Sequence, residues 1–215
     1  MQIWSDVQCP WCYIGKRKFE AAVDEFRGAG GEVSVTYRSF ELAPDTPVDF
    51  DGTPADYLSD RKGISREQAQ QMIDRVTSIA HAVGLEYRYD AIHQTNTVLA
   101  HELLHFAKDH GLQAELKERL LRAYFTEGRH IGRADELAAL AAEVGLDETA
   151  ARTALEHHTH LPAVKADMAQ AVAYGIQGVP FYVLNDAYGI SGAQEPSAFL
   201  AALRQAADGD GASTT

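Results

Sequence analysis

The only two cysteines of the 215-residue chain stand together as Cys9-Pro10-Trp11-Cys12, after a short apolar stretch and before a helical pattern. Two thiols separated by two residues at the start of a helix are close enough to form a disulfide. The unpaired amides and the dipole of the first helical turn favour a thiolate, so we expect a lowered pKa for Cys9. The motif predicts thiol–disulfide chemistry with Cys9 as the nucleophile and Cys12 as the resolving thiol.

The residues around the two cysteines suit this placement. Pro10 fits the first helical position, where its missing N–H would have no partner. Trp11 offers a large apolar surface beside the sulfur and, unlike histidine, no titratable proton. Asp6, three residues before Cys9, is a candidate proton acceptor for Cys12, although a carboxylate there fits equally well a role in capping or orienting the turn.

Metal binding is the alternative chemistry for a cysteine pair. Structural zinc needs four nitrogen or sulfur ligands, usually from paired short motifs, and the chain has no second cysteine pair. His101 and His105 share a helix face but lie far along the chain from the cysteines. The local cluster of His157, His158 and His160 is interpreted as a solvated helix end. We therefore predict no metal site.

Composition and charge limit the partners. The formal net charge of −12, from 31 acidic and 19 basic residues, argues against nucleic acid or an anionic membrane surface. Lys16 and Arg17, close behind the dithiol, are interpreted as a solvated helix face rather than as a source of positive potential. No apolar run approaches the length of about eighteen residues needed to span a membrane. Met1 leads straight into the motif without a leader segment, so we expect a cytoplasmic protein.

The hydrophobic pattern predicts an α/β fold. A short buried strand at residues 2–5, a helix at 9–27 and an alternating strand at 33–38 form a βαβ unit that carries the dithiol. After a Pro- and Asp-containing stretch at 44–54, helices without strands continue for about a hundred residues, each with one apolar stripe. A hairpin at 181–191 and a helix opened by Pro196 follow.

This order predicts a discontinuous domain with a helical insertion. The first domain comprises residues 1–52 and 162–207. The inserted helical domain comprises residues 53–161, and residues 208–215 are expected to form a disordered tail. Apolar stripes at helical spacing are typical of packed core, so the insertion is expected to shape a substrate groove.

Three stretches of sequence resemble one protein family. They are Ser5-Asp6-Val7-Gln8-Cys9-Pro10-Trp11-Cys12-Tyr13-Ile14-Gly15, Tyr124-Phe125-Thr126-Glu127-Gly128 and Gly178-Val179-Pro180-Phe181. Together with the order of elements, they resemble DsbA-like proteins of the FrnE type, over residues 1–207. The resemblance implies a thioredoxin fold with an inserted helical domain and a dithiol–disulfide oxidoreductase that requires no cofactor. It also implies that Val179-Pro180 is a cis peptide facing the dithiol and binding substrate.

Two other readings stay open at this point. The same superfamily includes 2-hydroxychromene-2-carboxylate isomerases and kappa-class glutathione transferases, which typically carry serine where this chain has Cys9. A glutathione-dependent isomerase or transferase acting on a small aromatic substrate is therefore an alternative. A redox-gated binding protein is the third reading. The expected partners are a protein or peptide that contains a disulfide or dithiol, with glutathione as a further candidate redox partner.

Overall fold

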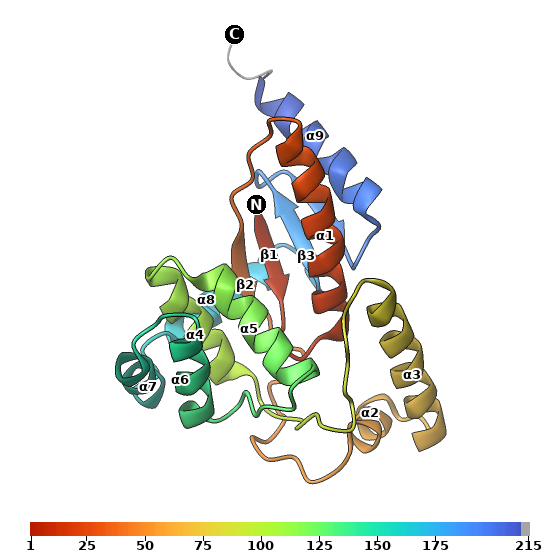
Figure 1. The fold of residues 1–215 in the computed structure, drawn as a ribbon, viewed down its shortest axis with the longest axis vertical. Helices are drawn as coiled ribbons and strands as arrows, with labels where there is room; N and C mark the ends of the chain where they lie inside the picture. Colours follow the sequence, from red (N-terminus) through yellow and green to blue (C-terminus); the bar gives the residue numbers. More distant parts are fainter. Residues whose placement is uncertain (212–215) are drawn as a thin grey trace.

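A four-stranded mixed sheet forms the centre of the structure, a computed structural model that describes residues 1–211 (Figure 1). Its strands are β1 (Gln2–Ser5), β2 (Thr36–Ser39), β3 (Phe181–Leu184) and β4 (Tyr188–Ser191), in the order β2-β1-β3-β4. β2 runs parallel to β1, whereas β3 is antiparallel to both β1 and β4. The sheet thus joins the beginning of the chain to segments almost two hundred residues later.

Helices cover both faces of this sheet. α1 (Pro10–Gly28) and α9 (Pro196–Gly211) pack together on one face, and α8 (Leu161–Ala173) lies on the other (Figure 1). Successive residues of β1 point to opposite faces, so Ile3 enters the α1–α9 cluster while Trp4 enters the cluster beside α8. The Trp4 indole N–H donates to the Asp167 carbonyl of α8 over 3.0 Å, which satisfies the one polar atom of this buried ring.

The segment between β2 and α8 contributes the remaining described helices. They are α2 (Pro54–Lys62), α3 (Arg66–Ala82), α4 (Val98–Asp109), α5 (Gln113–Phe125), α6 (Ala134–Glu143) and α7 (Glu148–Glu156). α2 and α3 lie on one side of the molecule and α4 to α7 on the other (Figure 1). α3 contacts α1, α4 contacts α8, and α5 contacts β2. Among the described helices, none is long and apolar enough to cross a membrane.

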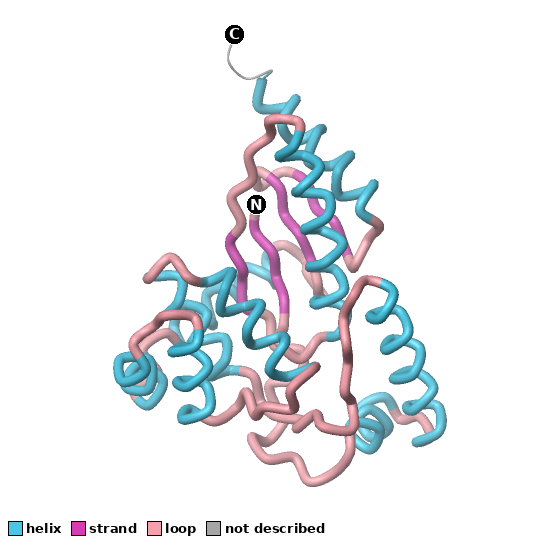
Figure 2. The backbone as a smooth tube through the Cα atoms, viewed as in Figure 1, coloured by secondary structure: helices cyan, strands magenta, loops and turns pink. Residues whose placement is uncertain are grey.

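Two long connections meet at the end of the sheet where β1 ends. Figure 2 shows extended loops gathered there, between the two groups of helices. The Phe50 amide donates to the Gln94 carbonyl over 3.4 Å, and the Asn96 side chain donates to the Pro44 carbonyl over 2.9 Å. These bonds hold the segment after β2 against the segment after α3, beside the turn that leads into α1.

The structure departs from the predicted elements at three boundaries. α1 begins at Pro10, with Cys9 as the residue before it. Pairing of β2 with β1 begins at residue 36 instead of 33, where the Thr36 amide donates to the Met1 carbonyl over 3.0 Å. α9 extends to Gly211, and Ala206 of this helix lies in the core. The predicted disorder of the tail at residues 208–215 stays a prediction. Residues 212–215 of the predicted tail lie outside the described residues. The domain boundaries drawn from the sequence stay a prediction.

Gly15 lies where α1 approaches β3 and the loop before it. A Cβ atom at this position would come 2.6 Å from the Tyr182 hydroxyl, 3.1 Å from Pro180 Cγ and 3.3 Å from Ala193 Cβ. Tyr182 is 1% exposed, so its ring has little space in which to move away. Glycine is therefore required here by close approach rather than by backbone conformation.

We predict that Gly15→Ala lowers the free energy of unfolding by about 1 to 3 kcal/mol, because overpacking outweighs the better helix propensity of alanine. Gly28→Ala, in the same helix, is the control: its Cβ would meet nothing within 4 Å. Urea denaturation should show Gly28→Ala equal to or above the parent protein. Equal loss of stability in both variants would contradict the close-approach explanation.

Candidate functional site

The turn between β1 and α1 places both cysteines at the buried end of the sheet. Cys9 precedes α1 with extended backbone (φ −84°, ψ 113°), and Pro10 takes the first helical position. The Cys12 amide donates to the Cys9 carbonyl over 3.0 Å, so the motif forms the first turn of the helix. Both thiols are free, and Cys9 and Cys12 are only 3% and 4% exposed. The Cys9 sulfur therefore stands at the positive end of α1.

The loop before β3 faces this turn. The Val179–Pro180 peptide bond is cis, and the Cys9 sulfur donates to the Val179 carbonyl oxygen at 3.6 Å. Gly178 is exposed and Val179 is half-buried, while Trp11 in the motif is 42% exposed. The fold thus brings the motif and the predicted substrate-binding loop together, although 170 positions separate Cys9 from Val179.

The two buried thiols titrate as a pair, because ionisation of one opposes ionisation of the other. The hydrogen bond with Cys12 and burial raise the pKa of Cys9 well above its ordinary value. Burial also opposes ionisation of Cys12, but the hydrogen bond from Cys9 lowers the pKa of Cys12. The Lys117 charge and the Ser5 hydroxyl lower it further. The expectation of a lowered pKa for Cys9 is therefore wrong: its hydrogen bond with Cys12 and its burial raise the pKa of Cys9, and Cys12 is the more acidic thiol of the pair.

Asp6 is completely buried in the turn before the motif. Its carboxylate accepts the Leu42 amide at 2.9 Å and lies 3.3 Å from His101 Nε2. Burial raises the pKa of Asp6, but His101 and the Leu42 amide overcome this effect and bring the pKa below its ordinary value. These contacts support a role in orienting the turn. A role as the proton acceptor for Cys12 stays a prediction, and a carboxylate of lowered pKa is a weak base for it.

The paired histidines of α4 bind carboxylates at the sheet. His101 reaches Asp6, and one helical turn later His105 Nε2 lies 3.1 Å from the Asp167 carboxylate and 3.2 Å from the Ser39 hydroxyl. The two histidines on one face of α4, which were considered as metal ligands from the sequence, therefore fasten α4 to β2, α8 and the β1–α1 turn.

The second histidine cluster also binds carboxylates. His158 Nδ1 lies 2.8 Å from Glu102, and His160 Nε2 lies 3.1 Å from Asp109. Across residues 1–211, no group of three or more histidine, cysteine, aspartate or glutamate side chains is arranged to hold a metal ion.

Four aromatic side chains form a cluster beside the motif. The Tyr87 hydroxyl donates to the Pro10 carbonyl at 2.7 Å, and the Tyr87 ring stacks on Phe125 with centroids 4.4 Å apart. Tyr89 packs edge-on against both rings, and Tyr13 packs against them from α1. Phe125 lies within a stretch that carries the family resemblance, but sequence reasoning did not use Tyr87 and Tyr89, although Leu85, Tyr87 and Tyr89 alternate with polar residues, a pattern that could have indicated their buried side.

Glu118 of α5 clamps the first turns of α1. It accepts from Lys16 Nζ at 2.5 Å, from Arg17 Nη1 at 3.0 Å and from the Tyr13 hydroxyl at 2.7 Å. Burial raises the pKa of Glu118, but its bonds to Arg17 and Lys16 bring that pKa down to about 2. The interpretation of these two basic residues as a solvated face is wrong, since Lys16 is 7% exposed and both bind Glu118.

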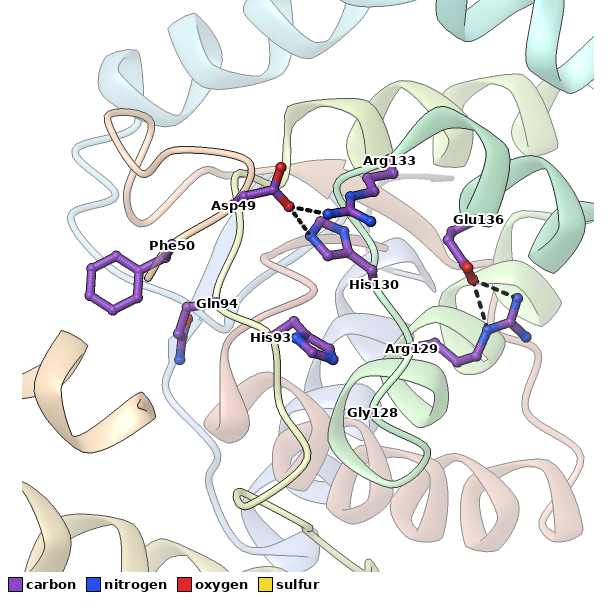
Figure 3. A pocket seen from close by; sticks show the side chains of 9 residues that line it. All are labelled: Asp49, Phe50, His93, Gln94, Gly128, Arg129, His130, Arg133 and Glu136. Atoms are coloured by element: carbon purple, nitrogen blue, oxygen red, sulfur yellow. Dashed lines mark hydrogen bonds and ion pairs between the residues drawn. The ribbon is translucent and has the colours of Figure 1, made fainter. Parts of the chain in front are cut away.

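A cavity of about 310 Å³ opens elsewhere, among loops of the inserted segment (Figure 3). On its wall, Asp49 binds both His130 and Arg133, and Glu136 binds Arg129 (Figure 3). Both arginines of the wall already have carboxylate partners. The lining contains neither cysteine and no part of the cis-proline loop, so we do not assign this cavity to the dithiol chemistry.

The geometry agrees with comparisons to known proteins. Residues 1–204 match the model of the DSBA-like thioredoxin domain. The chain therefore belongs to this family, which confirms the predicted thioredoxin fold with inserted helices. The protein YwbO of Bacillus subtilis, described as uncharacterized, is 30% identical over 188 residues, 86% of each chain.

Solved structures of other proteins share this fold. A probable DsbA oxidoreductase from Streptomyces coelicolor, SCO1869, superposes with a TM-score of 0.89 at 39% identity, covering 96% of this chain and 89% of its own. The cytosolic disulfide reductase DsbM of Pseudomonas aeruginosa, solved with GSH, superposes with a TM-score of 0.65 at 20% identity, covering 95% of this chain and 96% of its own. A 2-hydroxychromene-2-carboxylate isomerase superposes with a TM-score of 0.68 at 12% identity, covering 100% of this chain and 98% of its own. The last two similarities are similarities of fold.

We predict that Glu118→Gln destabilises the protein at neutral pH by about 1 to 2 kcal/mol, a value reduced for the partial exposure of the carboxylate. The folded-state pKa lies below the ordinary value of 4.5, so the stabilisation is complete above that pH and disappears as pH falls towards about 2. Urea denaturation between neutral and acidic pH should show the parent and variant curves converging. Exposed Glu115→Gln, in the same helix, is the control and should show no such convergence.

Proposed function

We propose that the protein is a thiol–disulfide oxidoreductase of the FrnE type, acting through the Cys9–Cys12 dithiol by way of a mixed disulfide. The observation that carries this proposal is the position of the Cys9 sulfur, at the N-terminal end of α1 and 3.6 Å from the Val179 carbonyl. Membership of the DSBA-like family and the oxidoreductase neighbours support it.

In the reducing direction, Cys9 first passes its proton to Cys12 through their hydrogen bond. The Cys9 thiolate attacks a substrate disulfide, which forms a Cys9–substrate bond and releases one substrate thiolate. Cys12 gives its proton to the released substrate thiolate and then attacks the Cys9 sulfur, which closes the Cys9–Cys12 disulfide, breaks the Cys9–substrate bond and releases the second substrate thiolate. Two electrons pass from the dithiol to the substrate, and the reverse sequence oxidises a substrate dithiol.

The cis-proline loop is proposed as the substrate-binding element. An extended segment of a protein or peptide substrate can pair with the backbone at Val179, next to the Cys9 sulfur. The exposed Gly178 leaves this backbone accessible, and the exposed Trp11 of the motif offers an apolar surface to a substrate. We propose glutathione as a redox partner and no further cofactor, a view supported by the structure of DsbM with GSH. A cytoplasmic location fits this reducing chemistry.

A glutathione-dependent isomerase or transferase acting on a small aromatic substrate is the second candidate. The similarity of fold to a 2-hydroxychromene-2-carboxylate isomerase favours it, although the aromatic cluster of Tyr13, Tyr87, Tyr89 and Phe125 is packed into the core and leaves no open ring face. Enzymes of that type carry a serine at the position of Cys9. The two candidates therefore make opposite predictions for replacement of this one side chain. A redox-gated binding protein would need a surface that changes between oxidised and reduced protein.

We predict that Cys9→Ser abolishes insulin reduction, because the sulfur that attacks the substrate is gone. Cys12→Ser should instead accumulate a mixed disulfide at Cys9, because the resolving thiol is missing. Turbidity assays and mass spectrometry after thiol blocking measure both outcomes. Full retention of activity on a chromene substrate by Cys9→Ser, with no insulin reduction by the parent protein, would overturn the oxidoreductase assignment in favour of the isomerase.

A further inference from the structure

Lys117 of α5 carries an amino group that the protein buries without a hydrogen-bond acceptor. The residue is 1% exposed, and Nζ has no hydrogen-bond partner among the described residues. Its ring contact is with Tyr37 of β2, whose centroid lies 5.6 Å from Nζ. Burial of an ammonium group without a paired anion is strongly unfavourable, so a lysine at this place requires an explanation.

The titratable groups that act most strongly on the charge of Lys117, together with the tyrosine that its amino group contacts, come from α1, from the turn before it and from β2. They are Cys9, Cys12, Lys16, Asp6 and Tyr37. Among them, the charge of Cys12 favours protonation of the Lys117 amino group most strongly, followed by Asp6 and Cys9. The cation at Lys16 opposes it.

Two of these neighbours already have partners of their own. The Asp6 carboxylate binds the Leu42 amide and His101, and Lys16 binds Glu118. For Cys12, Lys117 is the positive charge among the strongest influences that lower its pKa, and the other lowering influences are hydrogen bonds. The two buried groups are therefore complementary.

We propose that Lys117 is a positioning residue for the dithiol, whose ammonium group stabilises the Cys12 thiolate and so sets the redox equilibrium of the Cys9–Cys12 couple. The inference rests on the proposed function and deepens it. Glu118, the next residue in α5, clamps this helix onto α1, and that clamp fixes the ammonium group relative to Cys12. The inserted helices would then take part in the chemistry rather than only shape a groove.

The charge acts on one identifiable bond-breaking step. When a substrate thiolate attacks Cys9 in the Cys9–Cys12 disulfide, the substrate–Cys9 bond forms and the disulfide bond breaks. The electron pair of the broken bond goes to the Cys12 sulfur, which leaves as a thiolate beside Lys117. A leaving thiol of low pKa leaves faster, so the ammonium group assists this step. A second substrate thiolate then displaces Cys9, which takes up a proton from solvent.

Proton uptake by Lys117 accompanies this transfer. Burial brings the pKa of Lys117 down to about 8, and the charges of Cys12, Asp6 and Cys9 act against that effect. In the oxidised protein the sulfur charges disappear while burial remains, so the pKa falls further. Below pH 8, wherever Cys12 is ionised in the reduced protein, reduction should therefore add one proton at Cys9 and one at Lys117 for each two electrons, whereas above pH 8 the lysine should take up no proton. In a variant that lacks this lysine, reduction should add only the proton at Cys9, at every pH at which Cys12 of the reduced protein is ionised.

The first test is the redox equilibrium of Lys117→Met in glutathione buffers, read by thiol alkylation and mass spectrometry. Loss of the ammonium group destabilises the thiolate, so we expect the equilibrium to shift towards the disulfide by about tenfold, or about 30 mV. Lys117→Arg keeps the positive charge, so its redox equilibrium should stay close to that of the parent protein. Exposed Lys108→Met of α4 is the control and should leave the equilibrium unchanged.

The second test separates this role from a structural one. In the Cys9→Ala background, thiolate absorbance against pH reports Cys12 alone, and Lys117→Met should raise the pKa of Cys12. Thermal denaturation should show that Lys117→Met stabilises the oxidised protein more than the reduced protein, because the oxidised protein buries the lysine without the thiolate. The proposal would be overturned if Lys117→Met changed the thermal stability of the oxidised and the reduced protein equally and left the redox equilibrium unchanged.

The outcomes distinguish failure of this proposal from failure of the proposed function. A parent protein that forms no Cys9–Cys12 disulfide in any glutathione buffer would remove both. A disulfide that forms with the same equilibrium in parent and Lys117→Met would remove only the role of Lys117. If Lys117→Met does not fold, the dependence of the parent equilibrium on pH decides: one proton per two electrons on both sides of pH 8 would overturn the proposal.

Discussion

The constraint on which the site depends is burial of ionisable groups at the end of β1. Asp6, Cys9 and Cys12 lie within seven positions of one another and are all nearly inaccessible to water. In such an environment a charge is stable only where a partner of opposite sign or a hydrogen bond is fixed beside it. The position of each partner therefore decides which group ionises, and the thiolate goes to Cys12 although Cys9 stands at the end of the helix.

Those partners come largely from the inserted helices. His101 of α4 binds Asp6, and Glu118 of α5 fastens that helix to α1. The neighbouring Lys117 acts on Cys12. The insertion thus supplies groups that the sheet and its own helices do not provide at this place. A thioredoxin fold with the same two cysteines but another insertion would hold its thiolate in a different electrostatic environment.

Local signals made much of the fold predictable. Pro10 marked the start of α1, and the β–α–β order around the cysteine pair indicated the thioredoxin-like unit before any contact was known. Errors came where tertiary contacts override local pattern. Val33 and Val35 alternate as in a strand, yet they pack beside the core before pairing with β1 begins. Lys16 has the sequence of an exposed helix position, but Glu118 of another helix buries it.

The sequence by itself indicated thiol–disulfide chemistry, because two cysteines at this spacing before a helix can form a disulfide without help from distant residues. It also located the proline loop through the family resemblance. Only the tertiary structure decided which sulfur ionises more readily, since the charge that lowers the pKa of Cys12, beside the hydrogen bond from Cys9, is that of Lys117, more than a hundred positions away. Sequence spacing carries no information on that distance in space, whereas the energy of a buried charge depends on it directly.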